Sequence, residues 1–399
     1  MANAPLLMIP GPVEVSPAVL QAFGAPPPGH TGAPLIESFG RALERMRQVW
    51  QAGPESQPFV LTGGGTVAMD MVTANLTQPG DRVLVVDTGY FSDRIAEMLR
   101  RQGAEVIAVE AAVGEAPGPD EVRSAISAHG PFQALYATHV DTSTGVRIDP
   151  EPLARLAREH GMLSIFDGVC ATAGERFAMA AWDADVYLTA SQKALGLPPG
   201  LALLVASPRA LAVRAGRAGK GTPAPPMYLD WEQWLPVMRA YEERRPSYFS
   251  TPATNLILAL EVGLGEILEQ GVEARFAAHG RAASALRAAW RELGLTLVPA
   301  REELASNLLS ALRFPAGVDG TLVRRILDHG VAVAGGLHPA IRNEYFRVGH
   351  MGFVTGRPEL LRRTVAAVAA GLREAGGGQR ADGERAWAAA AAVLAAPVV

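Results

Sequence analysis

The stretch LTASQKALGLPPGLALLVAS, Leu188 to Ser207, holds the residue on which the fold assignment turns. Its lysine, Lys193, stands between two apolar segments, Val186–Leu188 and Leu201–Ala206. Apolar runs of this length predict buried strands. Taken alone, the stretch fits a lysine whose stem lies on apolar surface while its ammonium group reaches water. A chemical role for this amine therefore has to be argued from the rest of the chain.

Short apolar runs alternate with longer amphipathic stretches on both sides of this lysine, from about residue 58 to residue 207. The runs PFVLTGGGT, RVLVVDTG, EVIAVEA, QALYATHV, LSIFDGV, VYLTAS and ALLVAS predict strands. The stretches VAMDMVTANL, FSDRIAEMLRRQG and DPEPLARLAREHG predict helices between them. This alternation predicts an α/β domain with a mainly parallel sheet, and the near-continuous apolar runs indicate strands that are buried on both faces.

The C-terminal third has a different pattern. GKGTPAPP, Gly219–Pro226, predicts a loop, and TPATNLILALEVGLGEILEQG predicts a long helix. Strand-like LTLVPA and NLLSALRF are then mixed with the helix-like RFAAHGRAASALRAAWRELG, GTLVRRILDHG and PELLRRTVAAVAAGLREAG. We therefore expect an N-terminal segment over 1–20, a large domain over 21–255 and a small α+β domain over 256–375. The flexible, Ala-rich tail over 376–399 is expected to consist of a hinge and a loosely attached helix.

The composition excludes several classes of protein. Lys and Arg number 36 against 40 Asp and Glu, and the charges are dispersed, so no nucleic-acid or anionic-membrane partner is expected. The single cysteine, Cys170, excludes an internal disulfide and a metal site built from several thiolates, and no metal is expected. The N-terminus lacks a signal-peptide pattern, and no stretch approaches the roughly 18 apolar residues of a membrane span. These features predict a cytoplasmic protein.

A Gly-rich turn, TGGGTVAMD from Thr62 to Asp70, lies at a predicted strand-to-helix junction. Glycines there let backbone N–H groups approach an anion, and a helix N-terminus adds a favourable field. The turn is not a P-loop, because no Gly-Lys-Ser/Thr follows, and it lacks the Gly-x-Gly-x-x-Gly fingerprint of dinucleotide sites. A plain tight turn is the alternative interpretation.

A carboxylate completes a possible site. Asp167 ends the predicted strand LSIFDGV, and Lys193 follows the next predicted strand. Because ligands of α/β sheets bind at the carboxyl ends of the strands, these residues and the Gly-rich turn can share one edge of the sheet. An anion-binding turn, a carboxylate for a pyridine nitrogen and an amine for a Schiff base together suit pyridoxal 5'-phosphate.

Six motifs, in order, extend this interpretation. They are IPGPVEVSP near the N-terminus, HVDTSTGV, FDGVCATAGE, SQKALGLPPG, YFSTPATNLILAL and YFRVGHMG. Over roughly residues 6 to 372 the chain resembles the class V, fold-type I aminotransferases, in particular the alanine–glyoxylate and serine–pyruvate aminotransferase group. The resemblance implies the fold-type I architecture, pyridoxal phosphate as cofactor and a homodimer with shared active sites.

The resemblance also implies roles for individual residues. Lys193 would form the Schiff base with the cofactor, and Asp167 would pair with its pyridine nitrogen. Arg347, in YFRVG, would clamp the α-carboxylate of the substrate, a task that suits a planar guanidinium. Those three residues would carry the reaction.

The remaining implied contacts hold the cofactor. The phosphate would be bound at Gly64, Gly65, Thr66 and Gln192, the ring would stack on Phe91, the 3'-oxygen would lie near Thr142, and Tyr248 and Thr251 would reach the phosphate of the neighbouring subunit. Two positions depart from the family pattern. Asp141 stands where many members carry Glu, and GHTGAP from Gly29 replaces Gly-His-Arg-Ser.

The expected reaction is transamination of a small L-amino acid, alanine or serine, with glyoxylate or pyruvate as the oxo acid. Other amino donors within the same fold are phosphoserine, 2-aminoethylphosphonate and ureidoglycine. A cysteine desulfurase would need a reactive cysteine, whereas Cys170 is expected to be a small buried residue. A non-catalytic cofactor-binding protein of this fold is a further alternative, against which the intact lysine and aspartate weigh.

Overall fold

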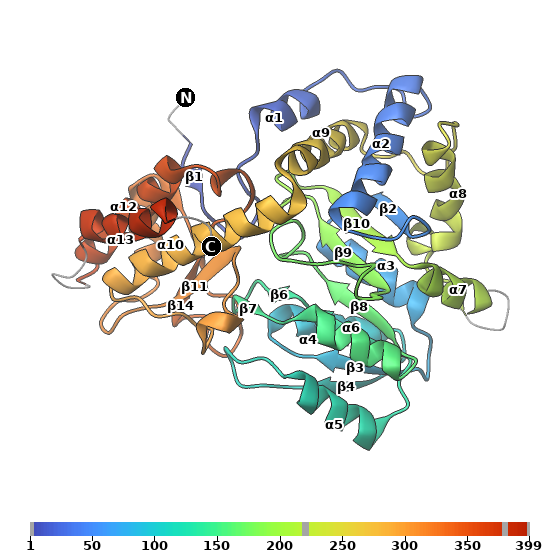
Figure 1. Cartoon of the computed structure of the whole chain (residues 1–399), viewed down its shortest axis with the longest axis horizontal. Coiled ribbons are helices and arrows are strands. Elements are labelled where there is room, and N and C mark those ends of the chain that lie inside the picture. Colours follow the sequence, from blue (N-terminus) through green and yellow to red (C-terminus); the bar gives the residue numbers. More distant parts are fainter. Residues whose placement is uncertain (1–3, 218–222, 377–381, 397–399) are drawn as a thin grey trace.

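A seven-stranded sheet organises the larger part of the chain in this computed structural model, which describes residues 4–217, 223–376 and 382–396. The strand order is β2-β10-β9-β8-β5-β3-β4 (Figure 1). The strands are β2 (Gln57–Thr62), β3 (Arg82–Val86), β4 (Glu105–Val109), β5 (Ala134–Thr138), β8 (Leu163–Asp167), β9 (Val186–Ala190) and β10 (Leu201–Ala206). Strand β10 runs antiparallel to both of its neighbours, and the other adjacent pairs are parallel. The predicted α/β class and mainly parallel sheet are confirmed, with all seven strands found.

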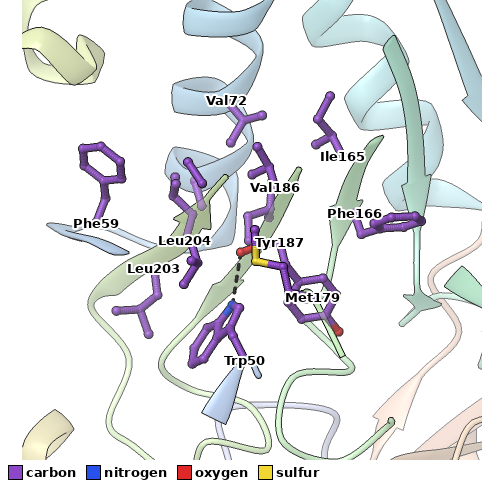
Figure 2. Packing of buried hydrophobic residues seen from close by; sticks show 14 of the residues in the cluster. Trp50, Phe59, Val72, Ile165, Phe166, Met179, Val186, Tyr187, Leu203 and Leu204 are labelled. Carbon is purple, nitrogen blue, oxygen red and sulfur yellow. Dashed lines mark hydrogen bonds between the residues drawn. The ribbon is translucent and has the colours of Figure 1, made fainter. Parts of the chain in front are cut away.

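Both faces of this sheet are buried in its six strands from β2 to β3, as the apolar runs predicted, whereas the edge strand β4 is only partly buried. Leu203 and Leu204 are consecutive in β10 and point to opposite faces, yet each is at most 1% exposed. Figure 2 shows them with other buried side chains of this core, where the indole N–H of Trp50 donates to the carbonyl of Tyr187 in β9 at 3.2 Å. The helices in contact with the sheet are α2 (Ala33–Val49), α3 (Gly65–Leu76), α4 (Tyr90–Arg101), α5 (Pro119–His129), α6 (Pro150–Glu159) and α8 (Trp231–Glu242).

A smaller α+β unit follows in the sequence and has its own core. Its three-stranded sheet has the order β11-β14-β13, formed by β11 (Leu309–Arg313), β14 (Tyr345–Gly349) and β13 (Ala334–Gly335). Helices α10 (Val272–Glu292), α11 (Thr321–Asp328) and α12 (Pro358–Glu374) surround this core. The prediction of a strand over LTLVPA, residues 295–300, is wrong, because this stretch forms only an isolated bridge between Leu297 and Leu312.

Two domain boundaries differ from the predicted ones. Only the start of the N-terminal segment belongs to the small unit, since β1 (Leu6–Leu7) pairs in parallel with β12 (Val331–Ala332). Helix α9 (Thr254–Gln270), placed in the small domain by the sequence prediction, packs against α2 and α1 (Pro17–Phe23) and buries its apolar stripe in the large core. The small core begins only within α10.

The helix that was expected in the tail is present, but it is not loosely attached. Residues Gly383–Ala395 form helix α13, which packs against α10 and α12 with Ala386 and Ala390 fully buried. The small side chain of alanine allows this close approach between helices. The expected hinge at 377–381 lies outside the described residues, as do positions 219–222 of the predicted Gly219–Pro226 loop.

The predicted helices GTLVRRILDHG and PELLRRTVAAVAAGLREAG are confirmed as α11 and α12. Other elements were not predicted from the sequence. They are β6 (Val140–Asp141), β7 (Val146–Arg147) and α7 (Pro208–Arg217), together with α1, α2, α5, α8, β1 and β12–β14. Within the described ranges, no helix combines the length and apolar character that a membrane span requires.

Candidate active site

Lys193 lies in the loop that follows β9, and the N-terminal segment covers its amine. The Nζ of Lys193 donates to the carbonyl of Pro10. Protein surrounds most of the side chain, and this burial lowers the pKa of its ammonium group below the ordinary value, an effect that the charge of Arg347 reinforces and that Asp167 opposes. The surroundings of Lys193 therefore favour the neutral, basic form of its amine more than water does.

Asp167 is the last residue of β8, at the carboxyl edge of the sheet. Its side chain is 2% exposed, and its Oδ1 accepts a hydrogen bond from the backbone N–H of Val169 at 2.8 Å. Burial raises the pKa of this carboxyl to about 7, while the N–H of Val169 and the charge of Lys193 act in the opposite direction. A carboxylate at this place requires a cationic partner to be fully ionised.

The Gly-rich turn meets the same edge of the sheet. Gly65 begins α3, and a Cβ there would lie 2.7 Å from a methyl group of Val169, so the glycine permits contact with the segment after Asp167. The N–H of Gly63 donates to Gly200, in the loop after Lys193, at 2.8 Å. The turn, the aspartate and the lysine thus share one edge, as the sequence predicted.

The N-terminus of α3 offers unused donors there. Gly64 is its N-cap and provides no side-chain acceptor. Among the described residues, the backbone N–H groups of Gly65 and Thr66 have no protein acceptor. The Oε1 of Gln192, beside Lys193, is also buried without a hydrogen-bond partner in the described part of the chain. These groups can receive a ligand that both accepts and donates hydrogen bonds.

Phe91 is partly buried in the first turn of α4, and its backbone is held by Asp141. The carboxylate of Asp141 accepts from the N–H of Phe91 at 2.9 Å and from the N–H of Ser143 at 2.8 Å. Asp141 is fully buried, and its oxygens are occupied by these backbone groups and by the Ser143 hydroxyl. Asp141, which stands where many family members carry Glu, therefore holds the backbone of Phe91 in place.

Arg347 lies in the middle of β14 and joins the small unit to this edge. Its Nη1 donates to the carbonyl of Thr142 at 3.1 Å, and its Nε donates to the carbonyl of Gly335 at 2.9 Å. Among the described residues, no carboxylate forms an ion pair with it, and burial lowers the pKa of the guanidinium. A partly buried cation held only by carbonyl groups can bind a carboxylate with its remaining N–H groups.

Tyr248 and Thr251 are not brought to the lysine of their own chain. Tyr248 is 60% exposed, and its hydroxyl lies 3.4 Å from the Oγ1 of Thr251. The ring of His30, in the GHTGAP segment, stacks obliquely on Tyr248 with centroids 5.1 Å apart. Their role at a neighbouring active site stays a prediction.

Comparison with known proteins agrees with this geometry. The family model described as Aminotransferase class-V matches residues 29–354. The chain belongs to the aminotransferase class-V family. It is 35% identical to alanine–glyoxylate aminotransferase 1 of Saccharomyces cerevisiae over 356 residues, which cover 87% of this chain and 91% of the yeast protein.

Two solved aminotransferase structures are similar over nearly the whole chain. Alanine–glyoxylate aminotransferase from Nostoc sp. has a TM-score of 0.86 at 32% identity, with 94% of this chain and 96% of that one covered. Ureidoglycine–glyoxylate aminotransferase from Bacillus subtilis has a TM-score of 0.89 at 26% identity, with 99% of each chain covered. The protein is thus an aminotransferase, and its fold is the fold type I that the resemblance implied.

Three residues of this class V aminotransferase site were not assigned a role from the sequence. Pro10 and Gly11 precede the family match, and only the quoted motif IPGPVEVSP pointed to them. Arg94 contacts Thr66 and the ring of Phe91, although nothing in its sequence context distinguishes it from the other arginines of α4. Each depends on contacts between distant segments.

Proposed function

We propose that this class V aminotransferase uses pyridoxal 5'-phosphate to move an amino group from alanine or serine to glyoxylate or pyruvate. The three relatives described above all carry glyoxylate in their names and differ in the amino donor. Because all three names include glyoxylate, they support an oxo acid as the acceptor. The donor has to be argued from the site itself.

One observation carries the proposal, namely the proximity of Lys193, Asp167 and Arg347. The charges of Asp167 and Arg347 both act on the pKa of Lys193, although the three residues come from different strands or loops. Arg347 lacks a carboxylate partner in the described part of the chain, which supports binding of an α-carboxylate beside the amine. In this proposal the carboxylate of a small amino acid binds Arg347 while its amino group lies at the amine of Lys193.

The residues present fit the cofactor. The free N–H groups of Gly65 and Thr66, at a helix N-terminus, suit a phosphate group. A Cβ at Gly64 would meet no atom within 4 Å, so open space lies beside these donors. The unpartnered Oε1 of Gln192 marks a polar position on the same side. Phe91 and Thr142 are the proposed neighbours of the ring.

When bound, the cofactor supplies a protonated pyridine ring that draws electron density from the Cα of the substrate. Asp167 would hold the proton at the ring nitrogen, because ionic pairing favours its carboxylate form over the neutral acid. The Nζ of Lys193 would remove the proton from the Cα of the donor, for which a lowered pKa is required. Arg347 would fix the carboxylate and thereby orient that Cα–H bond.

A homodimer in the cytoplasm completes the proposal. Tyr248 and Thr251 are directed to a neighbouring site by the family resemblance, and the exposure of Tyr248 leaves it available to a second copy. Leu20 and Phe23 of α1 are also exposed apolar residues. These features support a shared active site between two chains.

The deciding experiment is half-reaction spectroscopy with a panel of amino acids. Protein loaded with pyridoxal phosphate is mixed with alanine, serine, aspartate or ureidoglycine, and loss of the visible cofactor band is followed. Alanine or serine should react far faster than aspartate and ureidoglycine, and Lys193→Ala should abolish the reaction. Failure to take up the cofactor, or full turnover by Lys193→Ala, would show the proposal to be wrong.

Ureidoglycine is the second candidate donor, because the Bacillus subtilis structure with that name superposes over 99% of the chain. The same panel separates the two, since a faster reaction with ureidoglycine reverses the assignment. The desulfurase alternative finds no support, because Cys170 is 1% exposed and burial raises the pKa of its thiol. Phosphoserine and 2-aminoethylphosphonate remain alternatives to be added to the panel.

A further inference from the structure

Arg94 lies among groups that the proposed function assigns to the cofactor. It is in the second turn of α4, and its Nη1 donates to the hydroxyl of Thr66 at 3.1 Å. Its Nη2 donates to the hydroxyl of Tyr90 at 3.1 Å, and its guanidinium carbon lies 5.0 Å from the centroid of the Phe91 ring. The guanidinium therefore joins the start of α3 to the start of α4.

The charge of Arg94 is not balanced by an ion pair. Its N–H groups donate to two neutral hydroxyls, and among the described residues no carboxylate pairs with it. By contrast, Arg101 on the same helix pairs with Glu97 at 2.8 Å. The charge of Arg94 acts to lower the pKa of Asp167. Arg94 therefore does not serve as one half of a structural ion pair among the described residues.

The surroundings of Arg94 add to its positive potential. It contacts Thr66, in the first turn of α3, where the helix dipole and the free N–H groups of Gly65 and Thr66 are positive. Two positive groups facing each other repel, and this repulsion raises the free energy of the arrangement. A bound anion would reverse this cost, and a guanidinium has five N–H donors, of which the two hydroxyls engage two.

We propose that Arg94 is a phosphate-binding residue, which supplies the cationic charge for the cofactor phosphate at the N-terminus of α3. This inference rests on the proposed function for the identity of the ligand, and goes beyond it in assigning a charged side chain to a site whose other expected ligands are backbone and neutral groups. Its position over Phe91 lets the same side chain steady the aromatic ring beside the cofactor.

The experiment compares two ligands that differ only in the phosphate group. Dissociation constants for pyridoxal phosphate and for pyridoxal are measured on the full-length apoprotein by absorbance and by quenching of tryptophan fluorescence. Arg94→Gln should weaken pyridoxal phosphate by about tenfold or more, since it removes a charge-assisted contact. Its affinity for pyridoxal should change by less than about threefold, a difference of under 1 kcal/mol.

Two further variants control for charge and for helix stability. Arg94→Lys keeps the charge without the planar fork, and should lose less affinity for pyridoxal phosphate than Arg94→Gln. Arg101→Gln removes an exposed arginine of the same helix and should leave both constants unchanged. Circular dichroism melting of each apoprotein reports folding. If Arg94→Gln does not fold, Arg94→Met replaces it as the variant without the charge, and an affinity for pyridoxal phosphate equal to that of the wild type overturns the proposal.

The proposal is wrong if Arg94→Gln binds pyridoxal phosphate as tightly as the wild type, or if it loses pyridoxal and pyridoxal phosphate to the same extent. A wild type that binds no pyridoxal phosphate contradicts the proposed function instead. In that case inorganic phosphate, titrated into the wild type and Arg94→Gln, still tests the anion site. Equal phosphate affinity in the two proteins then overturns the role of Arg94.

Discussion

At the residue scale, the reactive lysine depends on a glycine from the other end of the chain. Gly11 has φ of +89°, in the left-handed region that favours glycine. A Cβ at this position would lie 2.7 Å from the Cδ of Lys193 and 2.8 Å from the carbonyl of Gln192. The absent side chain therefore gives the lysine its room.

Gly11→Ala should consequently displace Lys193 and reduce turnover. A displacement of about 1 Å at a catalytic group costs roughly 100-fold in rate, whereas the strained φ costs only about 1–2 kcal/mol of stability. Steady-state kcat with alanine and glyoxylate, together with urea denaturation, measures both effects. Gly320→Ala is the matched control, because its added Cβ meets no atom within 4 Å. Undiminished kcat in Gly11→Ala would contradict this reading of the contact.

At the scale of elements, prediction from sequence was most successful where burial is uniform. The strands of the large sheet are apolar on both faces, so each appears as a continuous run that local sequence reveals. Strand β14 instead carries Arg347 in its interior, and β13 has only two residues, so neither has a distinctive pattern. The Ala-rich helix α13 was expected from the sequence, but its close packing was not, because its contacts depend on small size rather than on large apolar side chains.

Helix α13 should contribute measurably to the stability of the small unit. Ala390 is fully buried where α13 packs, so Ala390→Asp would bury an unpaired charge and destabilise the protein by about 3 kcal/mol. Ala388 is exposed on the same helix, and Ala388→Asp should cost less than about 0.5 kcal/mol. Urea denaturation of both variants checks the difference. Equal stabilities would mean that α13 does not hold the small core together.

At the scale of the whole molecule, three buried histidines make stability depend on pH. His139, His279 and His350 are at most 2% exposed, and burial lowers the pKa of each to about 3. Each neutral ring is hydrogen-bonded, for example His139 to the Tyr187 hydroxyl at 2.9 Å. The folded state therefore binds fewer protons than the unfolded state, in which a histidine has a pKa of about 6.5.

Stability from these histidines is complete above about pH 6.5 and is lost as the pH falls toward 3. At pH 5 each should cost about 2 kcal/mol relative to neutral pH. Asp167 acts in the opposite direction, because its raised pKa makes the folded state bind a proton that the unfolded state releases. Urea denaturation of the apoprotein at pH 7.5 and 5 measures the net slope. His350→Gln should flatten it and exposed His160→Gln should not, so a slope unchanged by His350→Gln would argue against this origin.

The sequence alone determined the strands of the large sheet, the turn at Gly64–Thr66 and the candidate pair Asp167 and Lys193, because buried runs and strand ends are local patterns. Tertiary structure decided which of these features meet. It brought Pro10 onto the amine of Lys193, Arg347 onto the carbonyl of Thr142, and Arg94 onto Thr66. These contacts join segments far apart in the chain, so they depend on how the two cores pack and not on any pattern within one segment.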